Sequence, residues 1–360
     1  MKHRIKDGRG QFMKAYVLHD VNNLRFEEVE EPVLQDDRVL LEVKAAGICG
    51  SDIPRIYTNG TYHFPTIPGH EFSGKVVQVG KDVDSKWLNK RVGLFPLIPC
   101  KECGPCQKKQ YEMCKSYSYL GSREDGGYAE YVTVPAENLV ELPETVSYEA
   151  AAMMEPMAVA VHAMRRMDVG KEDTVVICGL GTIGLLLLMF LKETGVSNIL
   201  VVGNKDFQKE TILSLGISED CYCNSRSQDV EKWILEKTDE NGVDVFFECV
   251  GKNETVIHAI NSTIPGGKVM LLGNPHSDID FEQKIYWKIL RNQLTLKGTW
   301  NSSFIGKLDD DWHYVLNKVA EGKVNPEMLI THKLSFEELE KGLKIMRDKT
   351  EDYVKVMIYK

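Results

Sequence analysis

The chain has 360 residues, of which 43% are hydrophobic and 27% charged, a composition typical of a globular protein with more than one domain. It contains no run of about 18 apolar residues that could cross a membrane, so we expect no membrane partner. The formal net charge of −9 argues against a broad basic surface and therefore against a nucleic-acid partner.

Residues 1–12, MKHRIKDGRGQF, predict an N-terminal extension, because strand-like sequence begins only at a second methionine, Met13. The segment is basic and lacks the apolar core of a secretory signal. We therefore expect a cytoplasmic protein.

The stretch from Met13 to about residue 150 predicts an irregular β-rich domain. Runs rich in β-branched and aromatic residues are separated by Gly, Pro and Asn, with little helical periodicity. The clearest of these runs are VLLEVKAAGI, EFSGKVVQVG and YAEYVTVP.

Metal-binding residue types occur in three separate places in the chain. Cys49 lies in CGSD, His70 and Glu71 lie in GHE, and Glu155 lies in EP. Such residues can meet on one Zn²⁺ and leave a position for substrate or water, as a catalytic site requires. On its own, Cys49 would more often be a core residue, and His70 would more often be a hydrogen-bonded polar group. Their combination indicates a site.

Four closely spaced cysteines predict a second metal site. The pattern C-x2-C-x2-C-x7-C brings together Cys100, Cys103, Cys106 and Cys114. A closed set of four thiolates suits Zn²⁺ in a structural role. Disulfide bonds are the alternative, but nothing else in the sequence indicates an oxidising compartment.

From about residue 147 helical and strand-like segments alternate. SYEAAAMMEPMAVAVHAMRRM has helical spacing, and TIGLLLLMFLKETG predicts a second helix. The strand-like runs between and after them are TVVICG, NILVVG, VDVFFECVG, KVMLLG and LTLKGTW. This alternation predicts βαβ units on a parallel sheet. After Trp300 the sequence is mixed and charged, which allows a return to the first domain.

A dinucleotide-binding fingerprint, G-x-G-x-x-G, follows the strand TVVIC and opens a helix. Gly179, Gly181 and Gly184 permit a tight turn, close approach of a pyrophosphate and close helix packing. The helix start at Thr182 and Ile183 then offers N–H groups to the phosphates. A plain tight turn is the alternative.

The end of the next strand bears on the choice of cofactor. An acidic residue there binds the ribose of NAD, but this strand ends in Gly203, Asn204 and Lys205. Glycine leaves room for a 2′-phosphate and lysine supplies positive charge, so the sequence favours NADP(H) over NAD(H). The alternative is that Asp206 binds the ribose of NAD.

These residues together resemble the zinc-dependent medium-chain alcohol and polyol dehydrogenases. Four motifs match in order, namely GICGSD, GHEFSG, the four-cysteine loop and GLGTIG. The chain is most similar to the sorbitol and polyol-phosphate branch, through EPMAVAVHAMRR, SDIPRIYTNG, GSREDGGYAEY and ILRNQLTLKGTW.

The resemblance implies an α/β protein with a GroES-like catalytic domain over residues 13–160 and 300–360. A Rossmann NAD(P)-binding domain over residues 161–299 would be inserted between these two parts. It also implies two zinc ions per chain, one catalytic and one structural, and a homodimer or homotetramer.

The same resemblance assigns roles to the catalytic residues. Cys49, His70 and Glu155 would ligate the catalytic zinc, with Glu71 either a fourth ligand or a neighbour bonded through water. Asp52 would orient His70. The zinc would acidify a secondary alcohol, and hydride would pass to the nicotinamide.

The resemblance also suggests a proton path and a substrate. Ser51 can pass the alcohol proton outward, but many relatives place a histidine three residues further on, where this chain has Pro54. The implied substrate is a small-molecule polyol, such as galactitol 1-phosphate, which is oxidised to the ketose.

Candidate substrate-binding residues follow the first cysteine motif and the four-cysteine loop. They are Arg55, Tyr57, His63, Ser122 and Arg123. Arginine suits phosphate because its planar fork donates two hydrogen bonds. The alternative is that these residues are ordinary solvated surface residues.

Other functions remain open at this point. One alternative is a sorbitol, threonine or secondary-alcohol dehydrogenase that does not recognise phosphate. Another is a redox-inert NADP-binding protein on the same fold, which the joint presence of the four candidate catalytic ligands opposes.

Overall fold

The structure is a computed structural model that describes residues 12–275 and 277–360. The predicted N-terminal extension lies outside these residues except for Phe12, which begins the first strand. The chain forms two compact units. Unit 1 contains the chain up to Glu155 with Phe304–Ala320 and Asn325–Lys360, and unit 2 contains Pro156–Ser303 and Glu321–Val324. The predicted domain boundaries, between residues 160 and 161 and between residues 299 and 300, stay a prediction.

Unit 1 is built around a seven-stranded sheet of order β16-β17-β3-β4-β5-β9, with β8 also pairing with β3. Apart from the parallel pair β16–β17, its strand pairs are antiparallel. The strands are β3 (Arg38–Ile48), β4 (Glu71–Val79), β5 (Arg91–Leu94), β8 (Tyr131–Pro135), β9 (Leu139–Glu141), β16 (Ile330–Ser335) and β17 (Lys355–Tyr359).

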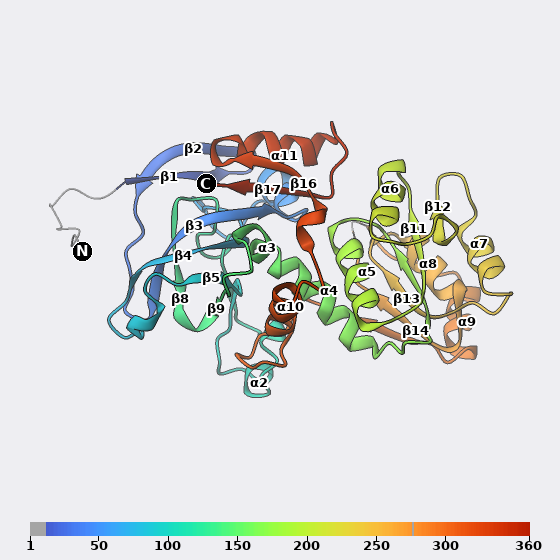
Figure 1. The fold of residues 1–360 in the computed structure, drawn as a ribbon. Coiled ribbons are helices and arrows are strands. Elements are labelled where there is room, and N and C mark those ends of the chain that lie inside the picture. The colour runs from blue at the N-terminus through green and yellow to red at the C-terminus, as the bar shows by residue number, and fades with distance from the viewer. Residues whose placement is uncertain (1–11, 276) are drawn as a thin grey trace. The chain divides into compact units, whose positions relative to one another are not determined.

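Strands that lie far apart in the sequence meet in this sheet. β17, the last strand, pairs antiparallel with β3, so that Val356 lies opposite Ile48. Figure 1 shows the red C-terminal strands beside the blue N-terminal ones. The predicted return of the chain to the first domain is therefore seen in unit 1.

Smaller elements complete unit 1. Two short antiparallel ribbons flank the sheet, formed by β1 (Phe12–Asp20) with β2 (Asn23–Glu30) and by β6 (Leu97–Ile98) with β7 (Ser118–Tyr119). The helices are α1 (Asp52–Pro54), α2 (Gly104–Gln107), α3 (Tyr148–Ala152), α10 (Asp311–Ala320) and α11 (Leu339–Asp348). Apolar residues of strands and helices from both ends of the chain form one core, including Leu41, Val76, Leu343 and Val356.

Unit 2 is a six-stranded parallel sheet of order β12-β11-β10-β13-β14-β15. Its strands are β10 (Thr174–Cys178), β11 (Asn198–Gly203), β12 (Tyr222–Asn224), β13 (Val243–Glu248), β14 (Thr263–Leu271) and β15 (Thr295–Gly298). Val175, Val176 and Ile177 are all fully buried, so β10 is covered on both faces. The chain leaves β10 toward β11 and later crosses to β13. Ligands of parallel sheets bind at the carboxyl ends of strands at such a switch point.

Helices follow most of these strands, in agreement with the predicted βαβ units, although the sequence predicted only the first of them by its residues. They are α5 (Thr182–Thr194), α6 (Asp206–Ser214), α7 (Val230–Lys237), α8 (Asn253–Ser262) and α9 (Gln283–Arg291). A further helix, α4 (Met154–Met167), runs through the boundary between the units. Among the described residues, no helix is both long and apolar enough to span a bilayer.

Candidate metal and cofactor sites

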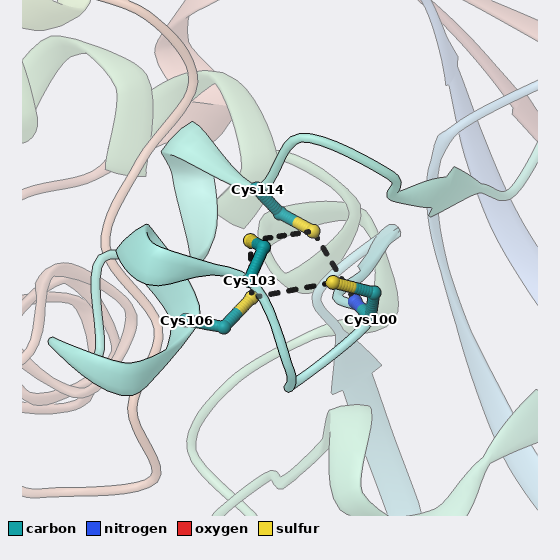
Figure 2. Close-up of side chains that lie close together, drawn as sticks. All are labelled: Cys100, Cys103, Cys106 and Cys114. Carbon is teal, nitrogen blue, oxygen red and sulfur yellow. Dashed lines mark hydrogen bonds between the residues drawn. The ribbon is translucent and has the colours of Figure 1, made fainter.

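The four cysteines of the loop converge on one point. Figure 2 shows the side chains of Cys100, Cys103, Cys106 and Cys114 turned toward one another. The Sγ–Sγ distances are 3.5 Å for Cys103–Cys106, 3.9 Å for Cys103–Cys114 and 4.0 Å for Cys100–Cys106. All four thiols are free, which excludes the disulfide alternative in this structure.

These distances fit a tetrahedral zinc ion. Zn–S bonds of about 2.3 Å in a tetrahedron separate the sulfur atoms by roughly 3.8 Å. Backbone N–H groups already stabilise negative charge on the sulfur atoms, since Lys115 N donates to Cys103 Sγ and Cys100 N to Cys114 Sγ. The hydrogen bond from Lys115 is the main reason why the pKa of Cys103 falls to about 6. The loop therefore presents a closed set of four sulfur ligands, without a position for substrate.

A second ligand cluster lies at the end of β3 and the start of β4. Cys49 directly follows β3, and Glu71 is the first residue of β4, which pairs with β3. One ligand atom each from Cys49, His70 and Glu71 lies within 4.8 Å of the others. His70 and Glu71 are buried, whereas Cys49 is partly exposed. The pairing of two strands thus brings together residues that lie about twenty positions apart in the sequence.

Asp52 organises this cluster from a completely buried position. Its carboxylate accepts hydrogen bonds from Cys49 N at 3.1 Å and Tyr128 Oη at 2.7 Å, and pairs with Arg55 Nη1 at 2.6 Å. Although burial opposes ionisation, His70 and Arg55 hold the pKa of Asp52 well below its usual range. Asp52 is therefore a fixed negative charge beneath the ligands.

The raised pKa of His70 indicates that the cluster favours a positive charge. Its Nδ1 lies 3.3 Å from Asp52 Oδ1 but is not aligned for a hydrogen bond. Despite burial, the charges of Asp52 and Cys49 raise the pKa of His70 well above its usual value. A divalent ion held by these residues would supply the positive charge that a proton on His70 otherwise provides. The donor set of sulfur, imidazole and carboxylate fits zinc.

Glu155, the third predicted ligand, lies beside this group. Its Oε1 accepts a hydrogen bond from Tyr119 Oη at 3.2 Å, and the Tyr119 ring lies 5.8 Å from that of His70. Burial is the main reason why the pKa of Glu155 rises to about 7, and the carboxylate of Glu71 adds to it. Among the described residues Glu71, not Glu155, completes the tight group with Cys49 and His70. The structure therefore has two carboxylates near one candidate metal site.

Glu71 has a cationic partner. Lys355 of β17 is 2% exposed and forms an ion pair with Glu71 Oε2. Although burial opposes it, Glu71 and, more weakly, Cys49 raise the pKa of Lys355. Lys355 is thus a buried ammonium ion with Glu71 as its partner.

The structure places the predicted proton and substrate residues as follows. Ser51 Oγ donates to Cys49 Sγ at 3.3 Å. The Arg55 guanidinium is paired with Asp52, and Tyr57 lies under the Arg347 guanidinium, 4.5 Å from it. Arg55 therefore already has an anionic partner beneath the metal ligands.

Arg123 also has partners within unit 1. Its guanidinium lies over the rings of Tyr62 and Tyr117, at 4.1 and 4.2 Å, and donates from Nη1 to Tyr117 O at 2.8 Å. The Arg123 carbonyl lies 3.1 Å from His63 Nε2, and Ser122 is buried. A substrate phosphate that binds Arg123 would have to fit beside these contacts.

The glycine loop of unit 2 has the expected geometry. Gly179 adopts φ +105°, which turns the chain sharply after β10. A Cβ on Gly184 would lie 2.0 Å from Gly179 O, so only glycine lets α5 pack this closely. A Cβ on Gly181, the N-cap of α5, would meet nothing within 4 Å. Open space at a helix N-terminus suits a pyrophosphate.

Packing gives a second reason for the glycine at position 203. A Cβ there would lie 2.7 Å from Gln208 Oε1 and 2.9 Å from the Tyr222 ring. Asn204 N donates to the same Gln208 oxygen at 2.8 Å, and Lys205 Nζ lies over the Phe207 ring. Packing alone can therefore account for the absence of an acidic residue at position 203, whichever cofactor binds.

Sequence reasoning missed Tyr119, Tyr128 and Lys355. The two tyrosines carry no local signal, because only the fold brings them to the ligands. Lys355 did have a signal: it stands in an apolar strand, YVKVMIY, where a charge needs a partner.

Two domain families match the chain. Residues 35–144 match the alcohol dehydrogenase GroES-like domain, and residues 182–321 match the zinc-binding dehydrogenase domain. These matches confirm the predicted fold class.

Similar proteins include polyol dehydrogenases. Galactitol 1-phosphate 5-dehydrogenase of Escherichia coli K12 is 32% identical over 86% of this chain and 89% of its own length. Sorbitol dehydrogenase of Bacillus subtilis is 29% identical over 97% of this chain and 98% of its own length.

Solved structures with the same fold contain different cofactors. A zinc-binding dehydrogenase of Sinorhizobium meliloti bound to NADP has a TM-score of 0.88 and 27% identity, covering 97% of this chain and 100% of its own. An alcohol dehydrogenase of Escherichia coli CFT073 in complex with NADH has a TM-score of 0.88 and 27% identity, covering 98% and 100%.

Proposed function

We propose a function from one premise: the chain belongs to the zinc-dependent medium-chain alcohol and polyol dehydrogenases. It oxidises a secondary alcohol of a polyol to the ketose, and the polyol carries a phosphate, as in galactitol 1-phosphate. The observation that supports this most is the group formed by Cys49, His70 and Glu71 within 4.8 Å, in a chain that also has a dinucleotide loop. The similarity to galactitol 1-phosphate 5-dehydrogenase supports the choice of substrate.

The residues of unit 1 would act together on the substrate hydroxyl. Cys49, His70 and Glu155 would hold the catalytic zinc, with Glu71 close beside it, and Asp52 keeps His70 in place. When bound, zinc supplies a Lewis acid for the alcohol and the nicotinamide supplies the hydride acceptor. Ser51 would carry the proton toward solvent, since its hydroxyl lies 3.3 Å from Cys49 Sγ and is exposed.

We assign two zinc ions to each chain, the second at the four-cysteine loop. We also favour NADP(H) over NAD(H). Lys205, two residues after Gly203, supports this choice, because it supplies positive charge at the end of the strand. Asp206, the first residue of α6, would bind the ribose if the cofactor is NAD.

We further propose that the protein works in the cytoplasm as a homodimer or homotetramer. Thiolate ligands need a reducing compartment. Unit 2 ends its sheet at β15, an exposed edge, and exposes Tyr286, Trp287 and Leu290 on α9. Unpaired edges and apolar patches favour self-association.

A second candidate is an unphosphorylated polyol or simple secondary alcohol. Arg55 is paired with Asp52, and Arg123 is held by two tyrosine rings and a carbonyl. A phosphate would therefore need a donor other than these two arginines, or would have to displace their present partners. The similarity to sorbitol dehydrogenase agrees with this candidate.

The test is a matched substrate panel. Galactitol 1-phosphate, galactitol, sorbitol, sorbitol 6-phosphate and threonine are each offered with NADP⁺ and with NAD⁺, and reduction is followed by nicotinamide absorbance. The proposal expects the highest kcat/KM for a phosphorylated polyol with NADP⁺.

Each other outcome has a definite meaning. Higher efficiency with the free polyol favours the second candidate, and a clear NAD⁺ preference overturns the cofactor assignment. No reduction with any substrate, in protein that holds two zinc ions, would contradict the dehydrogenase proposal. Arg123→Ala should weaken the phosphate more than the free polyol if Arg123 binds phosphate.

A further inference from the structure

The segment from Tyr119 to Tyr128 brings two tyrosine hydroxyls to the ligand cluster at Cys49. Tyr119 Oη donates to Glu155 Oε1 at 3.2 Å, and Tyr128 Oη donates to Asp52 Oδ2 at 2.7 Å. Neither tyrosine is a candidate metal ligand, so each acts on the cluster through the carboxylate that it contacts. The place of the candidate ligand Glu155 therefore depends on where this segment lies.

Backbone hydrogen bonds hold a tight turn at residues 119–124, which we call the 119–124 turn. The Tyr119 carbonyl accepts from three consecutive N–H groups, those of Ser122, Arg123 and Glu124, at 3.3, 2.9 and 3.1 Å. Gly121 N donates to Glu124 O at 2.8 Å and closes the turn from the other side. The backbone of Tyr119 can therefore move only together with the turn.

Arg123 joins the 119–124 turn to a second loop, at residues 61–65. Its guanidinium carbon lies 4.1 Å from the ring centre of Tyr62 and 4.2 Å from that of Tyr117. The Arg123 carbonyl lies 3.1 Å from His63 Nε2. A guanidinium over two aromatic faces is attracted to both rings, so one side chain holds two loops together.

A backbone contact between the two loops lies beside the guanidinium. Thr61 Oγ1 donates to the carbonyl of Ser122, the residue before Arg123, at 2.5 Å. Beyond the turn, Gly127 N donates to Gly69 O at 2.8 Å, and a Cβ at Gly126 would lie 2.0 Å from that oxygen. The segment is therefore fastened at both ends, and Arg123 is its fastening on the exposed side.

The same contacts limit what Arg123 can offer to a substrate. Its Nη1 already donates to Tyr117 O at 2.8 Å. Its Nε is buried from solvent and has no hydrogen-bond partner in the part of the chain that the structure describes. Bidentate binding of a phosphate uses two N–H groups on one edge of the guanidinium. The Nε edge is closed to a substrate oxygen, and the opposite edge already serves a carbonyl.

We propose that Arg123 is a positioning residue, not a phosphate donor: it clamps the 119–124 turn to the loop at residues 61–65, so that Tyr119 holds Glu155 beside the catalytic metal. The inference rests on the proposed function only for a metal at Cys49. Without the clamp the turn gains freedom, Tyr119 holds Glu155 less well and the metal leaves more readily. This loss is the same whether or not the substrate carries a phosphate.

Release of the catalytic metal tests the clamp without any substrate. With Co²⁺ at Cys49 and zinc kept in the four-cysteine loop, Arg123→Ala should release Co²⁺ to a chelator on the order of tenfold faster, as expected when the support of a metal ligand is removed. Tyr62→Ala should behave alike because it removes one ring, whereas Tyr62→Phe keeps the ring and should match wild type. Arg25→Ala, which removes an exposed arginine bonded to Asn23, is the matched control.

A double variant shows whether Arg123 acts through Tyr119. Tyr119→Phe removes the hydroxyl that donates to Glu155, so it should also speed release. Arg123→Ala/Tyr119→Phe should then release Co²⁺ no faster than the faster of the two single variants. Additive effects in the double variant would overturn the inference, as would unchanged release in Arg123→Ala. If Arg123→Ala does not fold, the comparison of Tyr62→Ala with Tyr62→Phe decides in the same way.

Turnover separates a clamp from a phosphate donor. Arg123→Ala should lower kcat/KM by the same factor for a polyol phosphate and for the free polyol. A selective loss for the phosphate would show that Arg123 binds it and would overturn the inference, while leaving the proposed function intact. Wild-type protein that binds Co²⁺ at Cys49 but reduces no cofactor with any substrate contradicts the proposed function alone. A wild-type chain that binds no metal at Cys49 overturns both.

Discussion

The two ligand clusters of unit 1 differ in how much of the fold they need. The four cysteines lie between Cys100 and Cys114, and their sulfur atoms meet within one loop that contains only short helices. The candidate ligands at Cys49 come from the end of β3, the start of β4 and the start of α4, and lie beside a buried aspartate and a buried lysine. The first cluster can shape its own loop, whereas the second can form only after the sheet has formed.

Because of this difference, we expect the first cluster to contribute to stability and the second to catalysis. A closed thiolate set stabilises the fold that binds it, because its binding free energy is also folding free energy. A cluster already held by Asp52, Tyr128 and Lys355 can keep a position open for substrate, because the protein and not the metal fixes the ligands. Three changes in the two clusters test the comparison, from the largest expected effect to the smallest. A fourth change, in unit 2, gives the smallest effect.

Cys49→Ala should have the largest effect. It removes a ligand of the open cluster, and loss of the metal is expected to lower kcat/KM by roughly a thousandfold, since a metal supplies several kcal/mol of charge stabilisation. Metal analysis should show one zinc per chain in place of two. Cys221→Ser, outside both clusters, is the control. Full turnover in Cys49→Ala would remove the cluster from the mechanism.

Cys103→Ser should reduce stability before it reduces turnover. Loss of the loop zinc is expected to lower the free energy of unfolding by roughly 3 kcal/mol or more. Urea denaturation measures this, and turnover per folded molecule should stay within about threefold at low temperature. Normal stability with selective loss of turnover would contradict the structural assignment.

Asp52→Asn should weaken the open cluster without emptying the loop. Removing a charge that supports a metal ligand typically lowers metal affinity or activity by roughly 10–100-fold. Chelator competition and kcat/KM measure the two effects. Asp36→Asn, which breaks the exposed pair with Lys81, should change neither. Equal behaviour of the two variants would show that the buried network is dispensable.

His258 provides the smallest effect, in unit 2. Its hydrogen bond with Glu231, at 2.8 Å, raises the pKa of His258, and Glu254 and Asp229 add to this. Because the folded-state pKa is above the unfolded value, the stabilisation is complete below about pH 6.5 and is lost as pH rises through the folded pKa. The stability difference between wild type and His258→Gln should be under about 1 kcal/mol and should shrink on going from pH 6 to pH 9. A stability difference that does not change with pH would show that the charge of His258 does not contribute to it.

The sequence predicted the features that depend on nearby residues. The four-cysteine cluster was readable because its ligands lie within one short run, and α5 begins at Thr182 as its glycine motif indicated. The parallel sheet of unit 2 was readable because central strands such as β10 and β11 are continuous apolar runs, whereas the short strand β12 (Tyr222–Asn224) was not predicted. Element boundaries moved by a residue or two: the first strand begins at Phe12, not at Met13.

The remaining details depend on contacts between distant parts of the chain. The sequence offered Arg55 as a substrate-binding residue, yet in the fold it neutralises Asp52 three residues earlier. Nothing local shows that Tyr119 would reach Glu155, or that Lys355 would meet Glu71 across 284 positions. The substrate assignment of Arg55 therefore stays a prediction, because a hydrogen-bonding group can be assigned only when its competing partners are known.

The position of β17 has a consequence for the order of synthesis. The strand that carries Lys355 is made 307 positions after Ile48, which lies in the strand that it joins. Until β17 is made, Glu71 lacks its partner Lys355 and the sheet lacks a strand. The four-cysteine loop, in contrast, is complete once Cys114 is made. Removing the residues from Lys355 onward should therefore leave a chain that holds a single zinc, at the loop, so that the two clusters form at different stages of synthesis.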